Sequence, residues 1–319
     1  MAYLEITVHT APGMAEKTAA ALTSGGFSEL MIEDQQEFED FLEENRACWD
    51  YIDEEFQEKL QGLSCIKLYL ENTDEAGLAR LETLLEKLRG GDLGDLPVTT
   101  TLLAEENWEE SWKDSYPPQP VGEKLIVLPY WLADSDGSGR LPVILDPGLT
   151  FGTGAHPSTQ MVMETMEETL RPGAVCLDLG SGSGILSITA LRLGAKSAIG
   201  VDIDPKAEGI ARENAAYNGF AGDVFTALTG NVIADQALME DLAKKEYDAV
   251  LVNIVADVII GLAPVLPRFL GEQTRLICSG ILDTRLQDVT SALERAGLAV
   301  TAVRAKEEWR CVSAKRSNL

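Results

Sequence analysis

Histidine is scarce in this 319-residue chain and paired cysteines are missing, which excludes several kinds of site. The two histidines, His9 and His156, are too few for a histidine-rich metal centre. The five cysteines are scattered and never form a Cys-x-x-Cys pair, a pattern typical of reduced thiols in a cytosolic protein. We therefore expect buried, reduced cysteines, a cytoplasmic location and no metal ion.

Long hydrophobic runs are also missing. No apolar stretch reaches the roughly 18–20 residues that span a bilayer. The first residues read as a strand and lack the basic start and apolar stretch of a signal peptide. Apolar residues make up 45% of the chain, and its length allows two domains with a sizeable core. The sequence therefore predicts a globular protein without a membrane segment.

Positively charged residues are also scarce, since the chain has 26 Lys and Arg but 52 Asp and Glu. Residues 1–120 carry 27 acidic against 8 basic side chains, whereas the remainder carries 25 against 18. An acidic first third repels nucleic-acid phosphate and attracts basic partners. A merely solubilising surface is the alternative interpretation.

Residues 1–103 alternate between strand and helix signals. Strands are expected at residues 3–9, 30–32, 65–70 and 98–103, and helices at residues 14–22 and 75–88. This order is the ferredoxin-like pattern of a small α+β domain. An acidic insert at residues 37–58, with ten carboxylates and one basic residue, interrupts it and is predicted to be helical.

The strongest functional signal is the stretch VCLDLGSGSGIL at residues 175–186. An apolar strand leads through Gly180, Gly182 and Gly184 into a segment with helical periodicity. Such a turn presents free backbone N–H groups and the positive end of a helix to a ligand. Asp202 ends the next strand, 22 residues after Gly180, which is about the spacing of a ribose-binding acid in doubly wound nucleotide folds.

The glycine spacing discriminates between cofactors. A dinucleotide-binding turn, Gly-x-Gly-x-x-Gly, would need a glycine where the chain has Ile185, which disfavours an NAD oxidoreductase. The Gly-x-Gly-x-Gly spacing resembles motif I of the class I S-adenosylmethionine methyltransferases. The resemblance implies S-adenosylmethionine as cofactor, Gly180 and Gly182 as its backbone contacts, and Asp202 as its ribose ligand.

From residue 146 onward strands and helices alternate, which predicts a mostly parallel, doubly wound Rossmann-like α/β sheet. The strand at residues 247–253 ends in Asn253, so Gly180, Asp202 and Asn253 fall at the carboxyl ends of three strands, where ligands bind. The expected domains are residues 1–103 for substrate recognition, a linker at 104–135 that contains Trp108 and Trp112, and a catalytic domain at 136–319.

The stretch DPGLTFGTGAHPST at residues 146–159 narrows the resemblance to one family. It resembles the signature of the bacterial methyltransferases that modify large-subunit ribosomal protein eleven. Departures from the family pattern are Ser181, Val255 and residues 149–150. The resemblance implies that Thr159 contacts the cofactor and that the loop at residues 151–156 closes over the site.

A helix is expected at residues 160–170, with Ser158 or Thr159 as its N-cap. His156 is open to two interpretations, a part of the family signature or a side chain that shapes a capped loop. The helix at residues 207–218 ends at Asn218-Gly219, a pair that capping can explain.

The family resemblance implies a protein N-methyltransferase that acts on lysine ε-amines, the N-terminal α-amine, or both, of that ribosomal protein. Asn253 would contact the cofactor and orient the attacking nitrogen, helped by the backbone carbonyl of Ile254, and no general base is nominated. Base-flipping methyltransferases follow the equivalent Asn with a stacking aromatic residue, whereas this chain has Ile254, Val255 and Ala256. We expect a basic protein partner, no direct nucleic-acid partner, no membrane contact and a monomer.

Three alternatives remain open from the sequence. The first is methylation of another basic protein, and the second is methylation of a small molecule. The third belongs to a different class, a non-catalytic binding protein gated by the cofactor.

Overall fold

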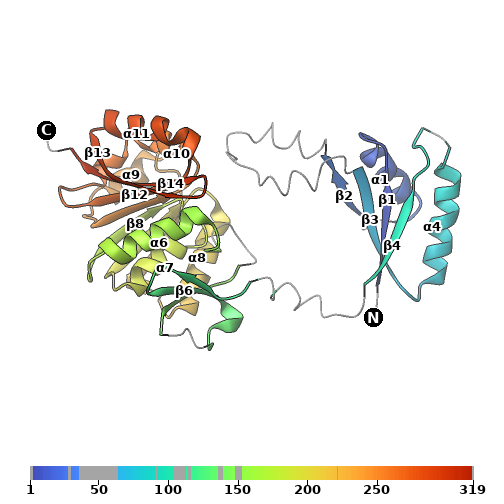
Figure 1. Cartoon of the computed structure of the whole chain (residues 1–319), viewed down its shortest axis with the longest axis horizontal. Coiled ribbons are helices and arrows are strands. Elements are labelled where there is room, and N and C mark those ends of the chain that lie inside the picture. The colour runs from blue at the N-terminus through green and yellow to red at the C-terminus, as the bar shows by residue number, and fades with distance from the viewer. Residues whose placement is uncertain are drawn as a thin grey trace. The chain divides into compact units, whose positions relative to one another are not determined.

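The computed structural model describes residues 3–27, 30–35, 64–90, 92–103, 113, 116–135, 139–147, 153–220 and 222–317 (Figure 1). The acidic insert at residues 37–58, the connector residues Trp108 and Trp112, and residues 151–152 of the loop lie outside the described residues. The chain divides into two compact units, Met1–Ser115 and Tyr116–Leu319.

In its described part, the first unit contains four strands and two helices. They are β1 (Tyr3–His9), α1 (Ala15–Ser24), β2 (Leu30–Asp34), β3 (Ser64–Glu71), α4 (Glu75–Leu88) and β4 (Val98–Leu103). The strand order is β2-β3-β1-β4, and every neighbouring pair is antiparallel. This is the ferredoxin-like arrangement that the alternation of strand and helix signals predicts.

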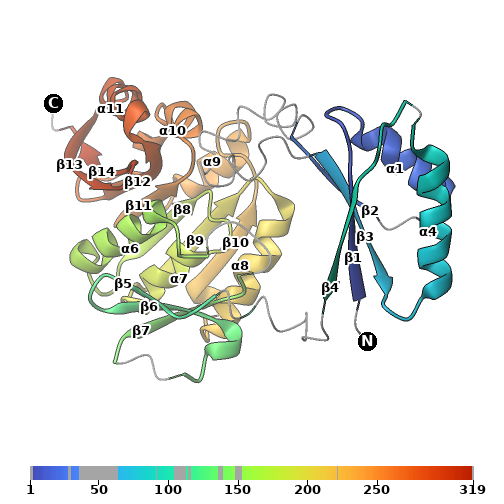
Figure 2. The same ribbon diagram turned by 45° about the vertical axis from the view of Figure 1, so that its right-hand side comes forward.

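Helices α1 and α4 cover the same face of this sheet (Figure 2). Leu81 and Leu85 of α4 are one helical turn apart and bury their side chains in one cluster with Ile66 of β3. Asp74 caps α4, because its carboxylate accepts a 2.8 Å hydrogen bond from the backbone N–H of Gly77. Apolar periodicity and the cap together explain why α4 has the bounds expected from the sequence.

The second unit contains a seven-stranded sheet with helices on both faces. Its strands are β8 (Val175–Leu179), β9 (Ser197–Asp202), β10 (Phe225–Thr229), β11 (Ala249–Asn253), β12 (Arg275–Leu282), β13 (Leu298–Lys306) and β14 (Trp309–Arg316). Its helices are α6 (Pro157–Thr169), α7 (Ile185–Arg192), α8 (Pro205–Tyr217), α9 (Gln236–Leu242), α10 (Ala256–Leu262) and α11 (Leu286–Arg295).

The strand order β10-β9-β8-β11-β12-β14-β13 places β8 near the centre of the sheet. The first five strands in this order are parallel, whereas β14 runs antiparallel to both of its neighbours. Side chains of α6, α7 and α8 form the core on one face, and those of α9, α10 and α11 form the core on the other. The predicted doubly wound α/β sheet is therefore confirmed.

A second, three-stranded sheet packs over α6, α7 and α8. It consists of β5 (Gln119–Val121), β6 (Leu125–Pro129) and β7 (Leu141–Leu145), with β5 antiparallel and β7 parallel to β6. Val121 and Leu125 are buried in the core of the second unit. This burial is why the compact unit begins at Tyr116, within the segment that the sequence analysis assigns to the linker.

Helix α6 begins earlier than expected, and its cap differs. The N-cap is His156, whose side-chain Nδ1 accepts a hydrogen bond from the backbone N–H of Ser158 at 3.3 Å. Pro157 occupies the first helical position, where a missing N–H costs nothing. The prediction of Ser158 or Thr159 as the N-cap is therefore wrong. Strands β5 and β14 and helix α10 are also absent from the sequence-based prediction.

Two further findings concern metals and membranes. The described ranges contain no cluster of three His, Cys, Asp or Glu side chains that could hold a metal ion. No helix in the same ranges has both the length and the apolar character needed to cross a bilayer. The described cysteines, Cys65, Cys176, Cys278 and Cys311, are buried and form no disulfide.

Two buried asparagines, Asn214 of α8 and Asn218 at its C-cap, tie this helix to the end of β7. The Asn218 amide accepts from the backbone N–H of Ile144 at 2.9 Å and donates to the Ile144 carbonyl at 2.7 Å. Asn214 accepts from the backbone N–H of Asp146 at 2.8 Å and donates to the carbonyl of Ser183 at 2.8 Å. Asn218 therefore does more than end a helix. Its side-chain amide bonds both the N–H and the carbonyl of Ile144, as the backbone of a neighbouring strand would.

We predict that Asn218→Ala lowers the free energy of unfolding by about 2–4 kcal/mol, because it leaves two buried backbone groups of Ile144 without these partners. Glu213→Ala, an exposed change on the same helix, is the control and should change stability by less than about 0.5 kcal/mol. Urea unfolding measures both. Equal effects of the two substitutions would contradict the role assigned to Asn218.

Candidate active site

Three parallel strands end next to one another in the seven-stranded sheet, in the order β9-β8-β11. Leu179, the last residue of β8, pairs with Val201 on one side and Val252 on the other. The residues that follow are Gly180, Asp202 and Asn253. The structure therefore brings these three sequence-predicted residues to one edge of the sheet, where ligands bind in such folds.

The turn after β8 depends on glycine backbone geometry. Three glycines of this turn have positive φ values, which are strongly disfavoured for residues with a side chain: 77° for Gly180, 48° for Gly182 and 79° for Gly184. Gly184 also lets α7 approach α8, because a Cβ placed on it would lie 3.0 Å from the Cβ of Ala211. The turn leads directly into the N-terminus of α7, so its backbone N–H groups and the helix end form a place for a polar ligand.

Asp202 is half-buried and already holds the turn. Its Oδ2 accepts a hydrogen bond from the backbone N–H of Gly182 at 2.8 Å, and its Oδ1 accepts one from the backbone N–H of Asp204 at 2.9 Å. Each carboxylate oxygen can accept more than one hydrogen bond. Asp202 is thus fixed in orientation and retains acceptor capacity for two hydroxyl groups of a ligand.

Asp178, which the sequence analysis does not single out, is fully buried beneath the turn. Its Oδ2 accepts hydrogen bonds from the Ser187 hydroxyl at 2.8 Å and from the Ser187 backbone N–H at 3.1 Å, whereas its Oδ1 has no partner among the described residues. Burial raises the pKa of this carboxyl to about 7, although both Ser187 bonds lower it, and the charge of Asp202 raises it further. An acidic residue inside an apolar strand is the signal that could have revealed it.

Asn253 and Thr159 contact each other directly. The Asn253 Nδ2 donates a 2.9 Å hydrogen bond to the hydroxyl of Thr159, in the first turn of α6. The Asn253 Oδ1 is buried and has no hydrogen-bond partner among the described residues. A buried acceptor without a donor is costly unless a ligand supplies one. Asn253 is therefore suited to receive an N–H group.

Ile254, which follows Asn253, packs between two glycines, with its side chain against Gly180 and its backbone against Gly280. A Cβ on Gly180 would lie 2.5 Å from the Cγ2 of Ile254, and a Cβ on Gly280 would lie 2.5 Å from the Ile254 carbonyl oxygen. The Ile254 N–H donates to the carbonyl of Ser279 at 3.2 Å. Gly280 therefore belongs to the architecture of the site, and the sequence analysis does not identify it.

His156 has a structural role in the chain segment before α6. Besides capping the helix, its ring contacts Trp309 edge to face, with the ring centroids 4.5 Å apart. Burial lowers the pKa of His156, although the charges of Glu308 and Glu307 raise it. A neutral imidazole is consistent with its acceptor role toward the Ser158 N–H.

Gln160 and Lys306 hold the same segment. Gln160 donates to the carbonyls of Ala155 at 3.0 Å and Gly154 at 3.3 Å. Lys306, the last residue of β13, donates in turn to the side-chain oxygen of Gln160. The β13–β14 hairpin thus helps to fix the chain that leads into α6.

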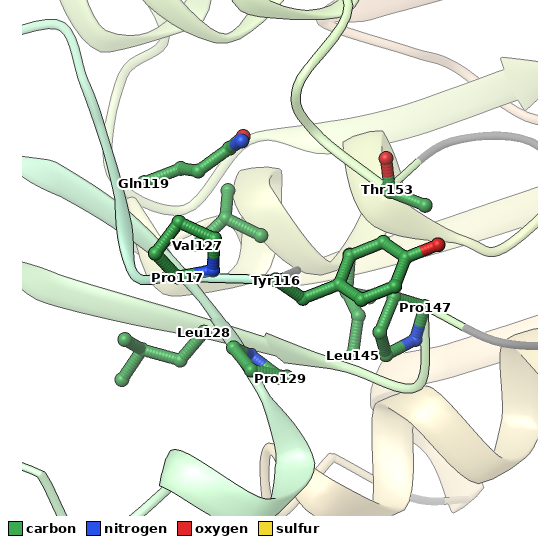
Figure 3. Close-up of a pocket in the computed structure, with 9 residues that line it drawn as sticks. All are labelled: Tyr116, Pro117, Gln119, Val127, Leu128, Pro129, Leu145, Pro147 and Thr153. Atoms are coloured by element: carbon green, nitrogen blue, oxygen red, sulfur yellow. The ribbon is translucent and has the colours of Figure 1, made fainter. Parts of the chain in front are cut away.

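A pocket lies beside this segment (Figure 3). Tyr116, Gln119, Pro147 and Thr153 line it, together with residues of β6 and β7. Its wall residue Val127 also adjoins Gly154, because a Cβ on that glycine would lie 2.9 Å from a Val127 methyl group and 3.1 Å from Ile185. The pocket therefore adjoins the segment that covers the start of α7.

The sheet order, its antiparallel strand β14 and the glycine turn after β8 define a class I S-adenosylmethionine-dependent methyltransferase. The sequence matches the family described as Ribosomal protein L11 methyltransferase (PrmA) over residues 2–317. The chain belongs to this family. The family, the enzyme class and the methyl donor that the sequence predicts are confirmed.

Individual relatives are similar along their whole length. The ribosomal protein L11 methyltransferase of Heliobacterium modesticaldum is 34% identical over 322 residues, covering 100% of this chain and 99% of the relative. That of Alkaliphilus oremlandii is 32% identical over 320 residues, covering 99% of both. The crystal structure of a ribosomal protein L11 methylase from Lactobacillus delbrueckii subsp. bulgaricus is 29% identical, with a TM-score of 0.57 over 64% of this chain and 100% of that chain.

We predict that Asp202→Ala lowers the affinity for S-adenosylmethionine by roughly 100-fold or more. It removes two hydrogen bonds to a charged group, each worth about 1.5–3 kcal/mol, as well as the bond to Gly182. Calorimetric titration measures the affinity, with the exposed change Glu272→Ala as control. A loss smaller than about threefold would show that Asp202 does not bind the ribose.

We predict that Asp178→Asn becomes progressively more stabilising as the pH rises from about 4 to about 7. The unfolded chain releases this proton near pH 4, whereas the folded chain holds it until about pH 7, so ionisation destabilises the wild-type fold across that window. The difference should grow by up to about 4 kcal/mol, at about 1.36 kcal/mol per pKa unit. Urea unfolding at several pH values tests it, and a difference that does not vary with pH would refute it.

Proposed function

We propose that this chain transfers methyl groups from S-adenosylmethionine to amino groups of ribosomal protein L11, on lysine side chains, the N-terminal α-amine, or both. Family membership supports the transferase class, and the relatives carry the name of this substrate. The observation that carries the choice of an amine is the buried Asn253 Oδ1, an acceptor without a donor at the edge of the sheet. Methylation of a small molecule is not favoured by these relatives.

The residues that would hold the cofactor are Gly180, Gly182, Asp202 and Thr159, and Asn253 would contact it beside the amine while contributing little to its affinity. The glycine turn presents backbone N–H groups beside the N-terminus of α7, and the Asp202 carboxylate retains acceptor capacity for ribose hydroxyls. Thr159 accepts a hydrogen bond from Asn253 and keeps its own hydroxyl hydrogen as a donor. These donors and acceptors fit the polar groups of S-adenosylmethionine.

When bound, S-adenosylmethionine supplies an electrophilic methyl group, and the amine nitrogen gains a C–N bond as the C–S bond to the sulfonium breaks. The task of the protein is to hold an uncharged amine in line with that group. A lysine amine has a pKa of about 10.4 and an α-amine about 7.7–8.0, so the site must favour the neutral form. The partly buried Asn253 amide accepts an N–H and leaves the nitrogen lone pair free, and burial favours the uncharged amine. The extra proton on the methylated nitrogen then passes to water.

The first unit, with the segment that follows it, is proposed to recognise the substrate. Residues 1–120 carry 27 acidic and 8 basic side chains, which favours a basic partner, and the relatives are named for a ribosomal protein substrate. We propose residues 1–103 as the recognition domain, residues 104–135 as the connection and residues 136–319 as the catalytic domain. Strands β5 and β6 of the connection belong to the same compact unit as the catalytic domain. A ribosomal protein substrate also implies a cytoplasmic location and no direct nucleic-acid contact, and we propose a monomer.

We predict that Asn253→Ala leaves the affinity for S-adenosylmethionine within about threefold of the parent and slows methyl transfer by at least tenfold, because the nitrogen loses its acceptor. Single-turnover transfer to ribosomal protein L11 measures the rate, with the exposed change Gln287→Ala as control. A rate within a factor of two of the parent would remove Asn253 from the mechanism.

We predict that a fragment of residues 104–319 binds S-adenosylmethionine and loses methylation of ribosomal protein L11. The compact unit Tyr116–Leu319 has its own buried cores, which supports independent folding of such a fragment. Methylation by the full chain should weaken as salt rises, because attraction between opposite charges is screened over about 8–10 Å at physiological ionic strength. A folded fragment as active as the full chain would show that the acidic unit is only a solubilising surface.

A further inference from the structure

Gly280 makes an unusually close backbone contact near the end of β11. A Cβ on Gly280 would lie 2.5 Å from the carbonyl oxygen of Ile254, 2.9 Å from its carbonyl carbon and 3.0 Å from its nitrogen. All three are backbone atoms, so no side-chain rotation can relieve the contact. Gly280 also has a φ of 81°, which disfavours any other residue.

The course of β12 explains this contact. Ser279 is the last residue of β12 that pairs with β11, opposite Asn253, and β12 continues to Leu282. The pairing of β12 with β14 shifts register between Cys278 and Ile281, which marks a β-bulge around Gly280. The Ile254 N–H is therefore held by its hydrogen bond to the Ser279 carbonyl, and the next peptide group, which carries the Ile254 carbonyl, is held by contact with Gly280.

We propose that Gly280 is a positioning residue, which sets the carbonyl oxygen of Ile254 as a second acceptor for the amine, beside the Asn253 amide. This inference rests on the proposed amine methylation. An uncharged primary amine has two N–H donors and one lone pair. Two fixed acceptors, the Asn253 Oδ1 and the Ile254 carbonyl, would bind both hydrogens and leave the lone pair in one direction, as an in-line attack requires.

The cost of a side chain at position 280 follows from the distances. A carbonyl oxygen 2.5 Å from a Cβ must move outward by several tenths of an ångström to reach a normal contact. Displacement of a reacting group by about 1 Å costs roughly 100-fold in rate. Gly280→Ala should therefore lower kcat on ribosomal protein L11 by roughly 10–100-fold and leave the affinity for S-adenosylmethionine within about threefold.

Gly297→Ala is the matched control. Gly297 has a φ of 80°, nearly the same backbone conformation, but a Cβ placed on it meets no atom within 4 Å. Both substitutions therefore impose similar backbone strain, and only Gly280→Ala creates the contact with Ile254. The control should retain kcat within about twofold, and a crystal structure of Gly280→Ala should show the Ile254 carbonyl displaced.

The test uses the full chain with ribosomal protein L11, with kcat, KM, cofactor affinity and melting temperature measured for each variant. If Gly280→Ala fails to fold, replacing Val255 by its α-hydroxy acid is the second test, because the resulting ester weakens the Ile254 carbonyl as an acceptor, although it also removes the Val255 N–H. That variant should lose about three- to tenfold in kcat with unchanged cofactor affinity. Full activity of a folded Gly280→Ala variant, or of the ester, overturns the role of Gly280. An inactive wild-type protein would instead overturn the proposed function.

Discussion

The candidate site depends on one steric constraint, the packing of Ile254 with its side chain against Gly180 and its backbone against Gly280. A Cβ at either glycine would lie 2.5 Å from an atom of Ile254. Gly180 begins the turn that is proposed to hold the cofactor, and Ile254 follows the amide that is proposed to receive the amine. The absence of two side chains thus allows the two halves of the site to lie next to each other.

Buried polar side chains give this close packing a defined geometry. Asp202 ties the glycine turn to the end of β9, and Thr159 ties Asn253 to the start of α6. Asn218 joins α8 to β7, the strand that leads into the segment before α6. These side chains are buried or half-buried, so a misplaced polar group would be costly. The site is therefore held from several elements at once.

The sequence predicted the sheet and the meeting of Gly180, Asp202 and Asn253, because a parallel sheet places successive strand ends at one edge. It did not predict the roles of Gly280 and Asn218. Those roles depend on contacts with Ile254 and Ile144, which lie 26 and 74 positions away in the chain. Local periodicity carries no information on such contacts. The cap at His156 was not predicted either, because Ser158 and Thr159, which follow closely, are residue types that cap helices more often.

The central claim is that this edge of the sheet transfers methyl groups to amines of ribosomal protein L11. The most direct measurement is mass spectrometry of purified ribosomal protein L11 after incubation with the full chain and isotopically labelled S-adenosylmethionine. The account predicts labelled methyl groups on lysine side chains, the N-terminal α-amine, or both. Unmodified ribosomal protein L11, or label on groups other than amines, would contradict it.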